Sequence, residues 1–243
     1  MSEASRVNLQ FIPKPIFLLA DSLLLFSREG DRHFLSRVAD QLEVGPARAR
    51  AAYLGASNGD LPEYFDMFRE AVAQVGIEDC MHVRAAPDRA ASDFLDSADV
   101  ILLAGGEVEA GWRAFENAGL VDRIRARSKQ GAVLIGISAG AVQLGRCASV
   151  EPGGALDLLS LVPYAVMTRE EPEWPSLVSV VERRNGEVVG LGVHSGAGAV
   201  VHPDLSVEPV RRPITEVSLQ DNEVRLREVL SFEPPPEGLR ELN

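Results

Sequence analysis

Short apolar runs alternate with amphipathic stretches over the first two-thirds of the chain. Five runs predict buried strands, at residues 15–19, 51–54, 81–83, 99–103 and 132–136. Between the runs, apolar residues recur at helical spacing, as in the set Leu35, Val38 and Leu42 and the set Phe65, Phe68, Val72 and Val75. A further helical region is expected through Trp112, Phe115 and Ile124. Continuous apolar strands separated by helices predict an α/β fold with a mostly parallel sheet flanked by helices.

The pattern changes at about Gly186, where short strands follow one another without long helices between them. They are expected at 187–193, 199–201, 206–210, 216–219 and 223–226, with a hairpin turn at Asp221-Asn222. We predict one domain over residues 1–232 with β-hairpins near its C-terminus, and a loose tail at 233–243. The alternative is two domains divided near Ser160. Ligand sites in such sheets lie at the carboxyl ends of strands, which directs attention to the loops after Leu19, Leu54, Leu103 and Gly136.

Charge and composition exclude several classes of partner. The chain of 243 residues has 24 basic and 36 acidic side chains, a net charge of −12, which disfavours nucleic acid and anionic membranes. Its two cysteines, Cys80 and Cys147, are too few for a disulfide framework or a zinc site. No apolar run approaches the roughly 20 residues of a membrane span, and the first residues lack a secretory pattern. We expect a cytoplasmic protein without a metal or other cofactor.

Gly136-Ile137-Ser138-Ala139-Gly140 is the segment that carries chemistry. It follows a predicted strand and precedes a helix start, which is the context of a G-x-S-x-G nucleophile elbow. The two glycines give the strained serine close clearance, so Ser138 is the predicted nucleophile. Gly105 and Gly106 end the preceding strand, and we expect the backbone N–H groups of Gly106 and Ala139 to form an oxyanion hole.

Three segments in this order resemble the peptidase S51 family, which includes aspartyl dipeptidase (peptidase E) and cyanophycinase. They are residues 53–60 (YLGASNGD), 98–106 (ADVILLAGG) and 136–141 (GISAGA), and a weaker similarity extends from about Pro15 to Val201. The resemblance implies a class I glutamine amidotransferase-like fold and a serine nucleophile. It also implies cleavage next to aspartyl or β-aspartyl residues without a metal.

The family's other catalytic residues are not matched. Its histidine is usual soon after a Leu-x-Pro segment, but here residues 161–163 (LVP) lead to Arg169 and Glu170. Its acidic residue is replaced by the segment 192–196, GVHSG, which places His194 beside the acidic position. A serine without a base is a poor nucleophile. Two hypotheses therefore stand, a hydrolase with a rewired triad and an inactive ligand-binding or protein-interaction module.

In the rewired triad, His194 is the base and Glu170, or another carboxylate, is the acid that orients it, because triads are defined by geometry and not by chain order. The competing expectation is that Glu170 and Arg169 pair with each other while His194 packs against the sheet. Arg169, Gly105 and Ser195 are the expected substrate-binding residues, and an arginine suits an acidic substrate. Trp174 is expected either to cover the cleft or to pack in the core. The expected partner is a small peptide or an amino-acid amide, and the option of a homodimer stays open.

Overall fold

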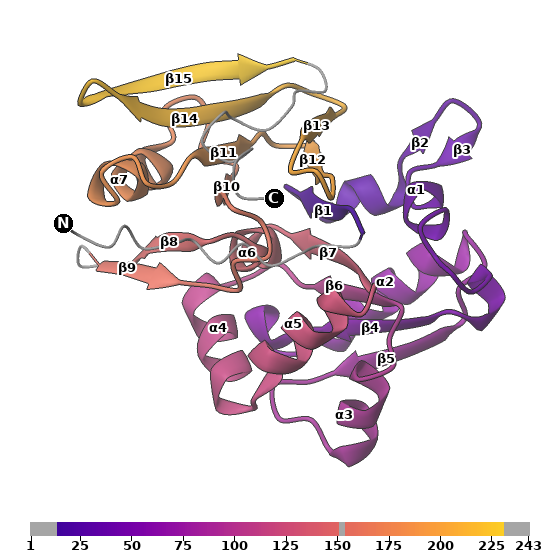
Figure 1. Cartoon of the computed structure of the whole chain (residues 1–243). Helices are drawn as coiled ribbons and strands as arrows, with labels where there is room; N and C mark the ends of the chain where they lie inside the picture. Colours follow the sequence, from indigo (N-terminus) through magenta and orange to yellow (C-terminus); the bar gives the residue numbers. More distant parts are fainter. Residues whose placement is uncertain (1–13, 151–153, 231–243) are drawn as a thin grey trace.

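The central sheet is mostly parallel, as the apolar runs predict. In the computed structural model, which describes residues 14–150 and 154–230, seven strands lie in the order β13-β12-β1-β7-β6-β4-β5 (Figure 1). The five that pair in parallel begin and end within two residues of the predicted runs. They are β1 (Ile16–Leu19), β4 (Arg50–Leu54), β5 (Asp79–Val83), β6 (Val100–Leu103) and β7 (Val133–Ile137).

Two layers cover this sheet because successive side chains of each strand point to opposite faces. In β1, for example, Phe17 packs into one buried cluster and Leu18 into the other. The Phe17 face is covered by η1 (Ser22–Phe26), α1 (Ser36–Ala39) and α2 (Pro62–Ala73). The Leu18 face is covered by α3 (Arg89–Leu95), α4 (Val108–Asn117), α5 (Leu120–Lys129) and α6 (Ala139–Leu144).

Helix boundaries depart from the periodicity at two places. The helical region predicted through Trp112 and Ile124 is two helices, α4 and α5, because Gly119 between them has a left-handed φ of 65°. The stripe that begins at Leu35 forms only the four-residue helix α1, and Leu42 packs against the core from beyond its end.

The C-terminal strands divide between two sheets, which the sequence pattern does not indicate. The pair β12 (Gly198–Val201) and β13 (Val207–Val210) extends the central sheet, with β12 antiparallel to β1. A second sheet has the order β10-β11-β14-β15. Its strands are β10 (Ala165–Thr168), β11 (Gly190–Val193), β14 (Ile214–Gln220) and β15 (Glu223–Val229).

The second sheet packs on both faces. Val166, Leu191 and Val193 belong to the same buried cluster as the Leu18 face of the central sheet. The opposite face holds Ala165 and Val217 and is covered by α7 (Pro175–Arg183) (Figure 1). The predicted turn at Asp221-Asn222 joins β14 to β15 with left-handed φ values. The predicted tail at 233–243 lies outside the described residues.

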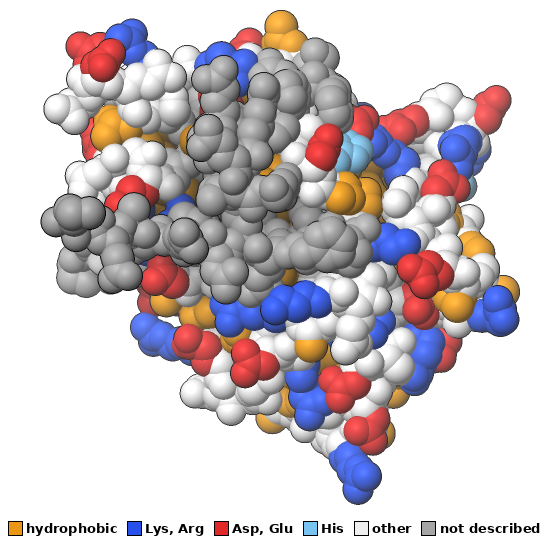
Figure 2. Space-filling model, in the orientation of Figure 1, with side chains coloured by type: hydrophobic (Ala, Val, Ile, Leu, Met, Phe, Trp, Pro, Cys, Tyr) orange, Lys and Arg blue, Asp and Glu red, His pale blue; other side chains and the backbone are white. Residues whose placement is uncertain are grey.

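Short elements complete the described chain. They are the hairpin β2 (Arg28–Glu29) and β3 (Arg32–His33), the 3₁₀ turns η2 (Pro46–Arg48) and η3 (Ala56–Asn58), and the hairpin β8 (Cys147–Val150) and β9 (Gly154–Asp157). No helix in the described ranges is long and apolar enough to cross a bilayer. Acidic and basic side chains are interspersed on the face drawn in Figure 2, in its lower part that holds α3 and α5.

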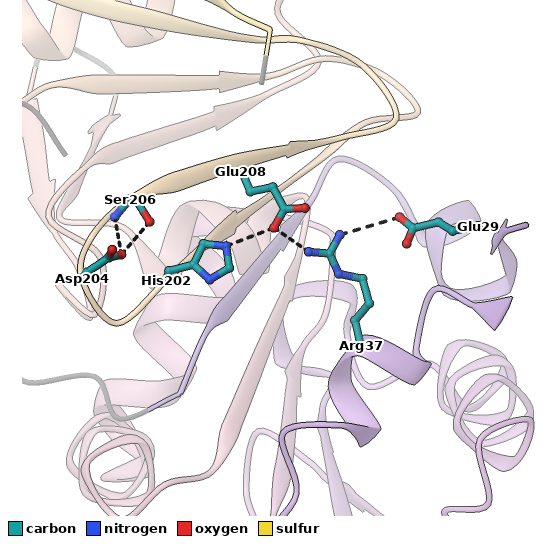
Figure 3. A network of polar contacts seen from close by, with 6 residues as sticks. All are labelled: Glu29, Arg37, His202, Asp204, Ser206 and Glu208. Carbon is teal, nitrogen blue, oxygen red and sulfur yellow. Dashed lines mark hydrogen bonds and ion pairs between the residues drawn. The ribbon is translucent and has the colours of Figure 1, made fainter. Parts of the chain in front are cut away.

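A polar network fastens α1 to the edge of the central sheet (Figure 3). Arg37 of α1 donates a 2.6 Å hydrogen bond to Glu208 of β13, and the same carboxylate oxygen is 3.0 Å from Nε2 of His202. Burial opposes the charge of Glu208, but Arg37 and His202 outweigh it, so its pKa lies below the ordinary value. Glu29 pairs with Arg37 at 3.7 Å.

Candidate active site

Ser138 lies where β7 ends and α6 begins, at the carboxyl edge of the parallel strands. Its N–H donates to the carbonyl oxygen of Leu19 at 2.8 Å, which places it directly beside the end of β1. Its φ of 49° and ψ of −111° fall outside the regions open to residues with a side chain. The predicted strand, tight turn and helix are therefore present, and the serine holds a strained backbone.

Neighbouring glycines allow this turn, because there is no room for side chains around it. A β-carbon at Gly136 would lie 2.6 Å from Cα of Ala141, and one at Gly140 would lie 2.1 Å from the carbonyl oxygen of Leu103. Gly106 has a φ of 136°, and a β-carbon there would lie 1.9 Å from the carbonyl oxygen of Ser57. The elbow is thus packed backbone to backbone against β6, and the glycine turn after β6 is packed in the same way against η3.

Two hydrogen bonds of a buried side chain connect the elements that border the elbow. The fully buried Gln143 of α6 donates from Nε2 to Oγ of Ser57 and to the carbonyl oxygen of Val108, both at 3.0 Å. These bonds tie α6 to η3 and to the start of α4. Three elements that border the elbow are fixed together by one side chain.

Arg169 is the side chain that reaches Ser138. Its Nη2 donates a 2.7 Å hydrogen bond to Oγ of Ser138. Arg169 directly follows β10 and has a left-handed φ of 59°, so strand alternation no longer sets its direction. No carboxylate of the described residues forms an ion pair with it. Arg169 is thus an exposed cation that has no charged partner among the described residues and donates to the predicted nucleophile.

His194 does not make the predicted contact with Ser138. Its Nε2 is 2.9 Å from Oγ1 of Thr215, and its ring lies edge-on to Trp174 with 5.1 Å between centroids. Val193 points into the large core, so its neighbour His194 points to the opposite face of the second sheet, where α7 packs. The Trp174 side chain is fully buried there, which fits its packing role and not a cover over the cleft.

Glu170 does not orient His194 either. Its Oε2 accepts a hydrogen bond from the backbone N–H of Ser176 at 3.1 Å, in the first turn of α7. Within residues 14–150 and 154–230, no hydrogen bond joins Glu170 or His194 to Ser138. The rewired triad is therefore not assembled in this structure, and the catalytic roles of these two residues stay predictions.

Ser195, an expected substrate-binding residue, takes part in a loop contact. Its N–H donates to Oε1 of Glu171 at 2.9 Å, and its carbonyl oxygen accepts from Arg212 at 3.0 Å. Burial opposes the charge of Glu171, but the N–H of Ser195 and the nearby His194 outweigh it and hold its pKa below the ordinary value. Glu171 is a carboxylate of this segment that sequence reasoning missed.

A pocket of about 220 Å³ opens beside the elbow. Of the predicted site residues, Gly105, Gly106, Ser138 and Arg169 line it, whereas His194, Glu170, Ser195 and Ala139 are not among its described lining residues. A β-carbon at Gly105 would lie 3.3 Å from Cβ of Ser138, so the two chain segments adjoin. Ala139 is the first residue of α6, where an amide has no acceptor within the helix. The oxyanion hole of Gly106 and Ala139 stays a prediction.

The other lining residues were not predicted from the sequence to belong to the site. They are Ala20, Asp21, Ser22, Leu25, Tyr53, Asn58, Tyr64, Met67, Phe68, Leu102, Ala104 and Ile137. Several of them follow Leu19, Leu54 and Leu103, the strand ends where a ligand site is expected, so their place in the sequence could have identified them as lining residues. Tyr64, Met67 and Phe68 come from α2, and nothing in the sequence indicated that they line the site. In the described chain, no group of three His, Cys, Asp or Glu side chains is placed to hold a metal ion.

Comparison with known proteins agrees with these features. The family model described as peptidase family S51 matches residues 17–191. The chain belongs to peptidase family S51. The matched range includes the elbow at residues 136–140, Gly105 and Gly106, and Arg169, and it ends before His194. Membership of this S51 family supports a peptidase-type function. No curated protein matches the S51 chain in sequence.

Two solved structures share its fold. A peptidase from an acI-B1 Actinobacterium is 11% identical with a TM-score of 0.64, and the alignment covers 93% of this S51 chain and 98% of that one. A protein described as a candidate peptidase E from Listeria monocytogenes EGD-e is 12% identical with a TM-score of 0.52, over 89% and 98% of the two chains. At such identities the likeness confirms the predicted fold class.

Proposed function

We propose that this S51 chain binds a small peptide or amide through a carboxylate at Arg169, and that Ser138 in its present contacts serves to bind and not to cleave. One observation carries the proposal, the 2.7 Å hydrogen bond from Arg169 to Oγ of Ser138. A guanidinium remains protonated at every physiological pH, so it has no lone pair with which to take the proton of a serine.

Charge alone does not replace the missing base. A cation beside Oγ favours the alkoxide, but the proton still needs an acceptor, and a serine hydroxyl hardly ionises unaided near neutral pH. Loss of one triad member typically lowers the rate by several orders of magnitude. Since Oγ already accepts a bond from Arg169, hydrolysis from this arrangement is expected to be very slow.

Arg169 is well suited to hold an anion. It lines the pocket, is exposed, and spends one of its five N–H donors on Ser138. Its planar fork matches the two oxygens of a carboxylate. A ligand carboxylate would supply the counter-charge that the described protein residues do not.

A second candidate function is hydrolysis of the bound peptide or amide with Ser138 as nucleophile. The strained backbone of Ser138 favours it, since such strain is concentrated at functional sites. In this candidate, the ligand carboxylate draws Arg169 away from Oγ, and His194 leaves Thr215 to accept the proton. The amides of Gly106 and Ala139 then face the developing oxyanion.

Calorimetric titration with N-acetylated dipeptides, each as free acid and as C-terminal amide, tests the binding proposal. We expect the acids to bind and Arg169→Gln to weaken them by about tenfold or more, because a hydrogen bond to a charged group contributes about 1.5–3 kcal/mol. Arg211→Gln is the matched control, an exposed arginine outside the pocket lining. Acids and amides that bind alike, or an Arg169→Gln variant that binds acids unchanged, would refute the proposal.

A fluorophosphonate probe separates the two candidates. We expect no labelling of the unmodified protein between pH 6 and 9, since the hydroxyl of Ser138 lacks a base. Labelling of the unmodified protein that disappears in Ser138→Ala would establish an activated serine and favour hydrolysis. A loss of that labelling in His194→Ala as well would identify His194 as the base.

A further inference from the structure

Apart from Arg169, the pocket has mainly apolar walls. One wall comes from η1 and α2, two elements that contact each other on the Phe17 face of the sheet. The floor comes from the strand ends. The apolar lining residues that matter here are Leu25, Tyr64, Met67, Phe68, Leu102 and Ile137. A ligand held by Arg169 would therefore meet apolar surface beside its carboxylate.

Exposed apolar side chains lie on the same two elements that form this wall, and one of them, Tyr64, also lines the pocket. Four large apolar side chains on η1 and at the start of α2 are exposed to solvent, by 70% at Leu23, 38% at Phe26, 44% at Leu61 and 46% at Tyr64. We call these four residues the apolar rim. The other large apolar side chains exposed in the described chain, Leu226 and Leu230, lie at the far C-terminal end. Exposed apolar side chains on two elements that contact each other suit a binding surface, since their exposure gains nothing for a free monomer.

The charges in the pocket provide for a single ligand carboxylate. Among its lining residues, Arg169 is the one cation and Asp21 the one anion. Asp21 is committed to the fold, because its two oxygens accept the N–H groups of Leu23 at 3.0 Å and Gly196 at 2.8 Å. A second ligand carboxylate would find no cation in the lining and would be repelled by Asp21.

A polar pair is available for the amide of the ligand. Nδ2 of Asn58 donates to the hydroxyl of Tyr53 at 2.8 Å, and both residues line the pocket. Oδ1 of Asn58 is buried and accepts no hydrogen bond from the described residues. Because this oxygen is closed to solvent, a small movement of the Asn58 side chain would be needed before it accepts an N–H from a ligand.

From the apolar wall, the rim and the single cation, we propose that the pocket selects ligands that combine one carboxylate with a large apolar side chain, and discriminates against aspartyl ligands. This inference rests on the carboxylate site of the proposed function. The apolar side chain lies against Tyr64, Met67 and Phe68 while Arg169 holds the carboxylate.

Three probes of similar size separate this inference from the proposed function. N-acetyl-L-phenylalanine has one carboxylate and an apolar side chain, N-acetyl-L-aspartate has two carboxylates, and N-acetyl-L-phenylalaninamide has no carboxylate. By calorimetric titration we expect the phenylalanine acid to bind at least tenfold more tightly than each of the others. Relative to the aspartate it buries a large apolar side chain, and relative to the amide it keeps the charged hydrogen bonds with Arg169.

Every other outcome is decisive as well. Acids that bind equally well, or aspartate that binds more tightly, would overturn the selectivity while the carboxylate site survives. A phenylalanine acid and its amide that bind alike would overturn the carboxylate site itself. Absence of binding by all three would overturn both.

Variants of the apolar wall test the location. Tyr64→Ser is expected to weaken N-acetyl-L-phenylalanine about fivefold to tenfold, and Leu226→Ser is the matched control, because both side chains are 46% exposed. Met67→Arg supplies a second cation, so it should tighten N-acetyl-L-aspartate and weaken the phenylalanine acid. Thermal unfolding of each variant checks that it is folded. Folded Tyr64→Ser and Met67→Arg proteins that bind both acids as the unmodified protein does would refute the proposed location.

Discussion

Exchange of Ser138 for glycine is expected to give a more stable protein than exchange for alanine. At ordinary positions the order is the reverse, because glycine loses more conformational freedom on folding and costs about 0.5–1 kcal/mol relative to alanine. Ser138 is different, since its φ of 49° and ψ of −111° strain any residue that has a β-carbon.

The difference between the two variants isolates the strain. Both lose the hydrogen bond from Arg169, so this loss cancels in the comparison. Backbone strain of this kind costs about 1–3 kcal/mol, and glycine removes it. After the entropic cost of glycine, the glycine variant should be more stable by about 1 kcal/mol. In a chain of 243 residues this corresponds to a rise of about 2–4 °C in melting temperature.

Urea unfolding of the two variants, followed by circular dichroism, measures this difference. Ala141→Gly is the control, three residues further along in α6 and fully buried, and it should be destabilised by about 1 kcal/mol as at an ordinary helical position. A glycine variant at Ser138 that is less stable than the alanine variant by 0.5–1 kcal/mol would show that the elbow is relaxed.

Three further predictions concern the surroundings of the site. Gly106→Ala should lower the free energy of unfolding in urea by more than about 3 kcal/mol, because its β-carbon would overlap the carbonyl of Ser57. The control Gly59→Ala, where φ is 74° but space is open, should lower it by about 1 kcal/mol. The pKa of Glu208 is lowered, so its charge stabilises the fold above the ordinary value of 4.5, and this contribution is lost as pH falls through the lower folded-state value. Between pH 7 and pH 3 the free energy of unfolding should therefore fall more steeply for the unmodified protein than for Glu208→Gln. Burial raises the pKa of Cys80 to about 11 from 9.0, so at pH 8 its thiolate fraction is much smaller than that of a free thiol. A thiolate of higher pKa is more nucleophilic, which offsets part of this loss, so a disulfide reagent should modify Cys80 about tenfold more slowly than a free thiol.

The central sheet was predictable because each of its parallel strands contains a short apolar run that the sequence shows locally. A continuous apolar run such as Val133–Ile137 is buried on both faces, and the run itself shows this. The division of the C-terminal strands was not predictable in this way. The partner of Ile16 in the antiparallel pair is Val201, and nothing in either short strand specifies a partner at that distance along the chain. The same strand pattern fits either sheet.

The parts of the site that depend on backbone geometry were predictable from the sequence. The glycines around Ser138 reflect a turn with no room for side chains, so the elbow and its position at the strand ends were found. The structure directs His194 to Thr215 and not to Ser138, and a local signal for this direction existed in the sequence. Val193 is apolar and buried, so alternation points His194 away from the core. Arg169 reaches Ser138 through a left-handed residue just after a strand, and no pattern of residue types predicts that conformation for an arginine.

Strain at Ser138 does not by itself require catalysis, because packing already accounts for it. The turn is fixed by contacts of Gly136 with Ala141 and of Gly140 with Leu103, which join β7, α6 and β6 within the core. Neither contact involves Arg169, so the elbow does not depend on which side chain reaches Ser138. Arg169 adds a cation to the pocket lining without a carboxylate partner among the described residues. The fold therefore retains a strained serine whether the site cleaves or only binds, and the presence of a proton acceptor for Ser138 distinguishes the two.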